Sequence, residues 1–167
     1  MRRLRLPGAM MARRLDLLWA GETKEPYARL AETKYLGLLG RYARVGMRRA
    51  ECPRGLANGP PGRYILEEDR RMAALLKADD HPVLLDPAGR EYESVALSRW
   101  LGAIFLSSRR PVFIVCGPHG AGPLVQAAAR DRLSLSRLTL AHDLARVVLL
   151  EQLYRALDLL QGGPYHK

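Results

Sequence analysis

The run PVFIVC at residues 111–116 constrains the fold more than any other feature of the sequence. It carries no charged side chain and shows no alternation between polar and apolar residues. A strand of this kind is buried on both faces, as happens in a parallel sheet that is covered by helices on both sides. We therefore expect residues 111–116 to form a central strand.

Strand-like runs and helical patterns alternate along the rest of the chain, which predicts an α/β fold with a mostly parallel sheet. Further strands are expected at residues 15–20, 44–50 and 83–86, and a mixture of strand and loop at 133–140. Helices are expected at residues 23–42, 64–78, 94–107, 124–132 and 142–161, where apolar residues recur at helical spacing. Pro87 and Gly89 should stop the strand at 83–86. Glu67, Glu68 and Asp69 should favour the start of the helix at 64–78 through its dipole.

The length of 167 residues suits a single domain, which we assign to residues 11–167. Met10 and Met11 are alternative start residues, so residues 1–10 are expected to be a disordered extension. No apolar run is long enough to span a bilayer, and the amino-terminal residues lack the apolar core of a signal peptide. Cys52 and Cys116 do not make a disulfide framework. We expect a cytoplasmic protein that binds no membrane.

The formal net charge is +10 and the isoelectric point is about 10.2. Such a balance favours a polyanionic partner, and nucleic acid is the usual one. A basic surface that serves only solubility is the competing interpretation.

Two segments after the central strand are candidates for a ligand site. The turn GPHG at residues 117–120 lets a ligand approach the backbone closely, although a simple tight turn explains it equally. The segment LSLSRLTL at residues 133–140 lacks a regular period, and Ser134, Ser136 and Thr139 can hold an irregular loop through hydrogen bonds to the backbone. An ordinary edge strand is the alternative.

The last helix and the tail add two further features. Apolar residues cover more than one stripe of the helix at 142–161, which indicates either a second subunit or burial within one chain. The tail ends in Tyr165, His166 and Lys167, which can stack on bases, exchange protons and bind phosphate, or can simply fray. The four histidines are scattered without metal-ligand spacing, so we expect no metal.

Three segments in this order resemble the RlmH family, the large-subunit rRNA pseudouridine N3-methyltransferases of the SPOUT superfamily of knotted methyltransferases. They are CGPHG at 116–120, LSLSRLTLAHDLARVVLLEQLYRAL at 133–157 and GGPYHK at 162–167. The resemblance is strong over residues 83–167 and extends more weakly to WAGETKEPY at 19–27.

The resemblance implies a C-terminal deep trefoil knot, a homodimer and S-adenosylmethionine as the methyl donor. The cofactor-binding residues it implies are Leu85, Cys116, Gly117, Gly120, Leu135, Ser136, Arg137, Leu138, Thr139 and Leu140. Cys116 stands where the family usually has a glycine, and a main-chain contact there survives if its φ is negative. His119 stands where an acidic or amide residue is common.

The implied substrate is a pseudouridine in 23S rRNA of the assembled ribosome. N3 must lose its proton, and the candidate acceptors are His142, Tyr165 and His166. His142 is almost equally suited to pack at the start of its helix. Arg146, Arg155 and Lys167 are the candidates for contacts with RNA phosphate, although Arg155 is also placed to pair with Glu151 one helical turn away.

Two other functions remain open on the sequence. A non-catalytic ribosome-binding or assembly factor that has lost turnover is favoured by Cys116, and a knotted methyltransferase that acts on tRNA is the second alternative.

Overall fold

The computed structural model describes residues 13–51 and 61–165. The extension expected at residues 1–10, Cys52, and the last two residues, His166 and Lys167, lie outside this part.

Five strands of the described chain form one sheet. They are β1 (Arg14–Ala20), β2 (Arg44–Ala50), β3 (Asp80–Arg90), β4 (Arg110–Val115) and β5 (Asp131–Leu133). Their order is β2-β1-β4-β3-β5, and each neighbouring pair is parallel. β4 lies in the centre and is buried from Pro111 onward. The prediction of a central strand in a parallel sheet is confirmed.

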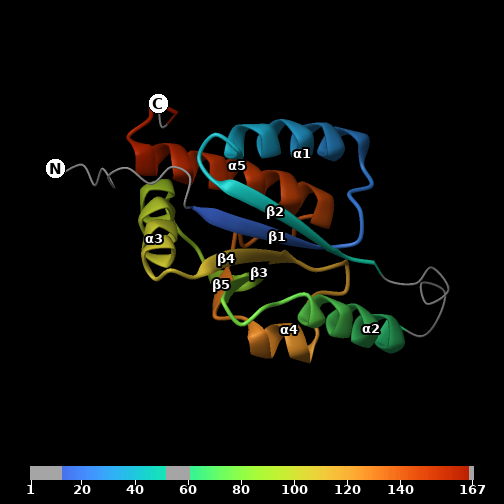
Figure 1. Ribbon diagram of the computed structural model, residues 1–167. Helices are drawn as coiled ribbons and strands as arrows, with labels where there is room; N and C mark the ends of the chain where they lie inside the picture. The colour runs from blue at the N-terminus through green and yellow to red at the C-terminus, as the bar shows by residue number, and fades with distance from the viewer. Residues whose placement is uncertain (1–12, 52–60, 166–167) are drawn as a thin grey trace.

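Helices cover both faces of the sheet (Figure 1). One face carries α1 (Pro26–Leu39), α3 (Ser94–Leu106) and α5 (His142–Gln161), and the other carries α2 (Pro61–Ala74) and α4 (Pro123–Ala128). β1 supplies both hydrophobic cores because successive side chains of a strand point to opposite faces. Leu17 and Trp19 belong to the core under α1, α3 and α5, whereas Leu18 packs with residues of α2 and α4.

The strand β3 is longer than the sequence predicts, and the expectation that it stops at Pro87 is wrong. Its pairing with β4 ends at Leu84, so Pro87 lies where no bond to β4 is needed. The pairing with β5 shifts in register between Leu85 and Arg90, which both lie opposite Leu133. This irregularity accommodates the missing N–H group of the proline.

The helix predicted at residues 124–132 is too long, because α4 ends at Ala128. Residues 131–133 pair with Val83, Leu84 and Leu85 of β3 instead. Sheet pairing therefore overrides the helical pattern at the end of this segment. The helix predicted at 23–42 is likewise shortened to α1, which begins at a proline and ends before Gly40.

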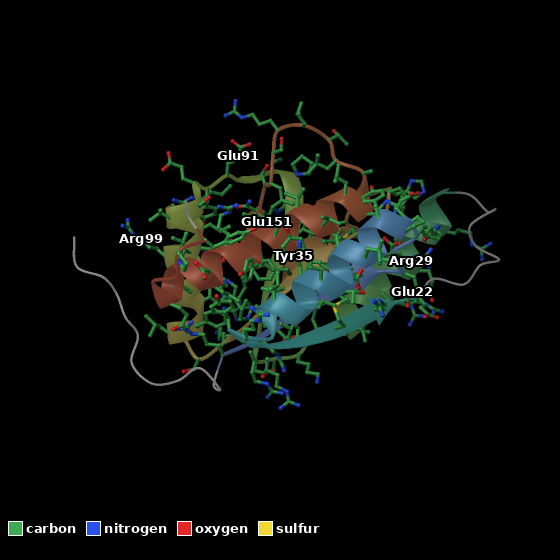
Figure 2. The ribbon with its side chains drawn as sticks, turned by 90° about the horizontal axis from the view of Figure 1, so that it is seen from above. Glu22, Arg29, Tyr35, Glu91, Arg99 and Glu151 are labelled. Carbon is green, nitrogen blue, oxygen red and sulfur yellow. The ribbon has the colours of Figure 1, made fainter. Side chains whose placement is uncertain are left out.

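The helix α5 has the bounds predicted from the sequence. Gly162 ends it with a φ of +73°, and its N–H donates to the carbonyl of Leu159 at 3.0 Å. α5 lies beside α1, with Tyr35 next to Glu151 (Figure 2). No described helix is both long and apolar enough to cross a membrane.

Packing within the chain uses only part of the apolar surface of α5. Leu149, Leu150, Leu153 and Leu157 are buried in the core. Leu144 remains 38% exposed, and Val147 and Val148 are half-buried. The contacts with α1 and α3 on its two flanks explain the buried part, and the remaining apolar strip faces outward.

Candidate functional site

A cavity of about 380 Å³ lies at the carboxyl ends of β3, β4 and β5. This volume is within the usual range for small-molecule sites, about 300–1,000 Å³, and such sites are typical of the carboxyl edge of a parallel sheet. Its walls are built by residues 85–87 in the second half of β3 and by two loops, one after β4 and one between β5 and α5. The lining residues are Leu85, Asp86, Pro87, Val115, Cys116, Gly117, Pro118, Gly120, Ala121, Leu133, Leu135, Ser136, Leu138, Thr139, Leu140, Ala141, His142 and Ala145.

The cavity brings together every predicted cofactor-binding residue except Arg137. The side chain of Arg137 is 91% exposed, and its nearest carboxylate is Glu91, at 3.6 Å from Nε. The side chain of Arg137 therefore points into solvent at the rim, between two residues that line the cavity, and its contact with the cofactor stays a prediction. The sequence did not identify Asp86, Val115 or Leu133 as lining residues. Asp86 directly follows the predicted Leu85, and Val115 and Leu133 are the last residues of β4 and β5.

Cys116 occupies the first position of the loop after β4 without backbone strain. Ser108 is the only non-glycine residue of the described part with a positive φ, so Cys116 meets the condition for a main-chain contact. Burial raises the pKa of its thiol to about 12, assisted by the negative charges of Glu68, Asp69 and Asp86. The thiol therefore stays protonated at neutral pH, and Cys116 acts as a wall of the cavity rather than as a nucleophile.

Two buried carboxylates of α2 hold the loop after β4. Glu68 accepts a hydrogen bond from the N–H of Gly117 at 3.0 Å, and Asp69 accepts from Leu124 and Val125, each at 2.8 Å. A Cβ at Gly117 would lie 2.7 Å from Oε2 of Glu68, so a glycine is needed for this approach. The two carboxylates of α2 therefore fix both ends of this loop.

The acidic residues of α2 have a different role from the one predicted. The helix begins at Pro61, so these acids lie beyond its first turn and the interpretation as dipole partners is wrong. Glu67 pairs with Arg70 and Arg71, whereas Glu68 and Asp69 point to the loop after β4. No local sequence pattern indicates this contact, because it joins residues about fifty positions apart.

The hydroxyl groups of Ser134 and Ser136 hold the loop between β5 and α5, as predicted for these two residues. Ser134 donates from Oγ to the carbonyl of Ser136 at 3.1 Å, and Oγ of Ser136 accepts from the N–H of Leu138 at 3.0 Å. These local bonds replace the ladder bonds of a strand, so the chain leaves the sheet after Leu133. The alternative of an ordinary edge strand throughout residues 133–140 is thereby ruled out.

The start of α5 closes one side of the cavity. His142 lines it with a side chain that is 32% exposed, and its Nε2 lies 3.5 Å from Oδ1 of Asp143. Asp143 accepts from the backbone N–H groups of Lys24 and Glu25 at 2.8 and 2.9 Å. Burial opposes the ionisation of Asp143, but these bonds and the charge of Arg146 outweigh it and hold the pKa of the carboxyl below its usual value.

Arg146 does not serve as a phosphate ligand, and that prediction is wrong. Its side chain is only 1% exposed and lies inside the fold. The guanidinium donates to the carbonyl of Ala20 at 2.6 Å, to Oγ1 of Thr23 at 3.1 Å and to Asp143 at 3.2 Å. It therefore fastens the turn after β1 to the start of α5.

Replacing Arg146 by alanine should destabilise the protein, because it removes the cation beside the buried carboxylate of Asp143 and a donor to the buried carbonyl of Ala20. We expect the free energy of unfolding to fall by about 3–5 kcal/mol, measured by urea denaturation. Arg155→Ala is the matched control, since it removes a partly exposed ion pair and should lower that free energy by less than about 1 kcal/mol. Equal urea midpoints for Arg146→Ala and the unaltered protein would contradict this assignment.

The tail packs on the other end of α5. The N–H of Tyr165 donates to Oδ2 of the buried Asp158 at 3.0 Å, and its ring centroid lies 4.7 Å from that of Tyr154. Arg155 lies 4.8 Å from the centroid of the Tyr165 ring and pairs with Glu151 at 2.7 Å. The tail is therefore held in place as far as Tyr165, and Arg155 is engaged by Glu151, the alternative left open by the sequence.

His142 and Tyr165 do not meet within one chain. They lie at opposite ends of α5, and a helix of 20 residues is about 30 Å long. Of the predicted catalytic residues, only His142 lines the cavity, and His166 lies outside the described residues together with Lys167. In the part of the chain that the structure describes, no group of three or more His, Cys, Asp or Glu side chains could hold a metal ion.

Comparison with known proteins identifies similar chains over almost the whole length. Residues 13–166 match the family model described as "Predicted SPOUT methyltransferase". A protein of Maridesulfovibrio salexigens is 40% identical over 92% of this chain and 97% of its own length. A protein of Gloeobacter violaceus is 39% identical over 92% of this chain and 98% of its own length. Both relatives are named ribosomal RNA large subunit methyltransferase H.

Proposed function

The chain belongs to the SPOUT methyltransferase family, and we propose that it methylates N3 of a pseudouridine in 23S rRNA of the assembled ribosome. Its relatives over nearly the full length are named as methyltransferases of large-subunit ribosomal RNA. The chain is therefore an enzyme that methylates this RNA. The position N3, the pseudouridine and the assembled ribosome as acceptor rest on the resemblance to the RlmH family.

The observation that carries the proposal is the cavity at the carboxyl edge of the sheet. We propose that it holds S-adenosylmethionine, which supplies a methyl group on a positively charged sulfur. Leucine side chains such as Leu85, Leu133 and Leu140 offer apolar walls that suit the adenine ring and the methylene groups. The main chain at Cys116 and the carboxylate of Asp86 offer polar groups for the ribose and the amino-acid part. The residues present therefore fit this donor.

His142 is the residue of the cavity that can accept a proton from N3. An imidazole accepts protons near neutral pH, and the side chain is open to the cavity and to solvent. Tyr165 and His166 of the tail remain candidates for the same role or for holding the base. Tyr165 is far from the cavity of its own chain. A tail that takes part in catalysis must therefore act at the cavity of another subunit.

We propose that two copies of the chain form a homodimer in which each tail reaches the cavity of the partner subunit. Only an antiparallel arrangement of two α5 helices brings the end of one next to the start of the other. The outward strip of Leu144, Val147 and Val148 offers an apolar surface for this contact. An isologous interface of this kind repeats the same contact twice and so builds two equivalent sites.

The C-terminal segment is further proposed to form the deep trefoil knot that the resemblance implies. In support, the loops after β4 and β5 both border the cavity, and α5 follows the second of them directly. We propose a single knotted domain over residues 11–167. We place the protein in the cytoplasm, where ribosomes are.

The contact of Glu68 with Gly117 should control affinity for the donor rather than turnover. Glu68→Ala removes a charge-assisted hydrogen bond that fixes the loop, so we expect the Kd for S-adenosylmethionine to rise about tenfold, with kcat little changed at saturating donor. Glu68→Gln retains an acceptor at Oε1 and should stay close to the unaltered protein. Calorimetry and steady-state kinetics give the two quantities. A lower kcat with normal Kd in Glu68→Ala would contradict this role.

Calorimetry with S-adenosylmethionine also tests the cofactor assignment and separates the enzyme from a non-catalytic ribosome-binding factor. We expect binding with one donor site per cavity, and no binding would refute the proposed use of the cavity. Labelled donor offered separately to ribosomes and to tRNA then tests the acceptor. Label in tRNA alone would favour a knotted tRNA methyltransferase.

A further inference from the structure

We propose that Arg14, Arg41 and Arg44 form a docking surface for the phosphate backbone of rRNA beside Tyr165. This arginine surface lies at the amino ends of β1 and β2, the opposite end of the sheet from the cavity. The proposal deepens the proposed function, because it names residues that hold the RNA substrate.

The three arginines are brought together by the sheet and by the turn after α1. Arg14 and Arg44 are partners in the parallel register of β1 and β2. Arg41 lies in the turn between α1 and β2, where its N–H donates to the carbonyl of Leu38 at 3.2 Å. The ends of α1 and α5 lie at this same end of the molecule as the starts of β1 and β2 (Figure 1). All three side chains are exposed.

No described carboxylate neutralises the charges of the arginine surface. Within the described residues, none of the three has a carboxylate within 4.0 Å, whereas the neighbouring Arg48 pairs with Asp16 and Asp80. Three exposed cations without acidic partners favour a polyanion, since the release of its counterions drives the binding.

A chain of contacts joins the arginine surface to the tail. Tyr42 lies between Arg41 and Arg44 in the sequence, and its hydroxyl donates to Oδ1 of Asp158 at 2.8 Å. The other oxygen of Asp158 accepts from the N–H of Tyr165 at 3.0 Å. The exposed ring of Tyr165 is therefore anchored to the same structure that carries the arginines. Phosphate-binding cations beside an accessible aromatic ring are what single-stranded RNA recognition uses.

RNA binding measured at several salt concentrations tests the proposal. The variants are the single changes Arg14→Ala, Arg41→Ala and Arg44→Ala, and the triple reversal of all three to glutamate. The probe is an isolated 23S rRNA fragment, and Arg130→Glu is the control, since this exposed arginine lies between α4 and β5. Far-ultraviolet circular dichroism and calorimetry with S-adenosylmethionine check that each variant folds.

Each single change should lower the slope of log K against log salt concentration by about 1. The triple variant should bind the fragment more than about tenfold more weakly at low salt, with an unchanged Kd for S-adenosylmethionine. Normal RNA affinity and slope in folded single variants would overturn the proposal. A loss confined to ribosomes, with normal binding to free rRNA, would assign the surface to an acidic protein and also overturn it. These readouts do not depend on methyl transfer, so they stand apart from any failure of the proposed function.

Discussion

A protein that lacks residues 165–167 is expected to bind S-adenosylmethionine normally and to lose methyl transfer by roughly 10²–10⁴-fold, the contribution typical of positioned acid–base groups. The reason is the separation of the two sites along α5. The cavity is walled by loops at the start of this helix, and the tail is held at its end by Asp158 and Tyr154. Removing the tail therefore leaves the walls of the cavity unchanged.

Calorimetry and single-turnover transfer of labelled methyl to ribosomes measure the two quantities separately. Tyr165→Phe is the matched variant, because it keeps the ring and removes only the hydroxyl. Loss of methyl transfer in Tyr165→Phe would indicate a role for the hydroxyl. Loss of methyl transfer in the truncated protein alone would indicate a role for the ring or for the last two residues. Full transfer by the truncated protein would exclude the tail from catalysis and leave His142 as the remaining candidate.

Mixing two inactive variants should restore activity if each tail serves the cavity of the partner subunit. One variant lacks residues 165–167. The other carries Gly120→Val. Gly120 lines the cavity with a φ of +78°, a conformation that a β-branched residue strongly disfavours, so this change should distort the cavity. In a mixed dimer, the intact cavity of the first subunit meets the intact tail of the second. Equal mixing makes about half of the dimers mixed, each with one working site of two, so about a quarter of normal activity should return.

The mixing result separates the two possible arrangements sharply. If the tail served the cavity of its own chain, no mixed dimer would contain an intact site and the mixture would stay inactive. Calorimetry must first show that Gly120→Val no longer binds S-adenosylmethionine. Refolding the two proteins together ensures exchange of subunits, and each variant refolded alone provides the background.

Much of the fold followed from the sequence because buried strands and helix ends leave strong local patterns. The apolar run at 111–116 marked the central strand, and Gly162 marked the end of α5. The errors arose where a tertiary contact overrides the local pattern. β3 continues past Pro87 because its register shifts there, and α4 stops early because the residues after it pair with β3.

The site was predictable to the extent that it is built from consecutive loop residues. Nearly all of the residues implied by the resemblance line the cavity. The sequence did not reveal burial. Arginine is usually exposed, but Arg146 lies in the core. Contacts between distant segments were equally hidden, as with Glu68 and Gly117. The placement of His142 and Tyr165 at opposite ends of the molecule is a consequence of the length of α5, which separates them.

Methyl transfer to ribosomes that lack the modification is the decisive measurement of the proposed activity. Assembled ribosomes from cells without such an enzyme would be incubated with the protein and S-adenosylmethionine carrying a labelled methyl group. The rRNA of the large subunit would then be digested to nucleosides and analysed by mass spectrometry. We expect label in 23S rRNA as a single N3-methylated pseudouridine. Label in another nucleoside, or none in large-subunit rRNA while the protein binds the donor, would contradict it.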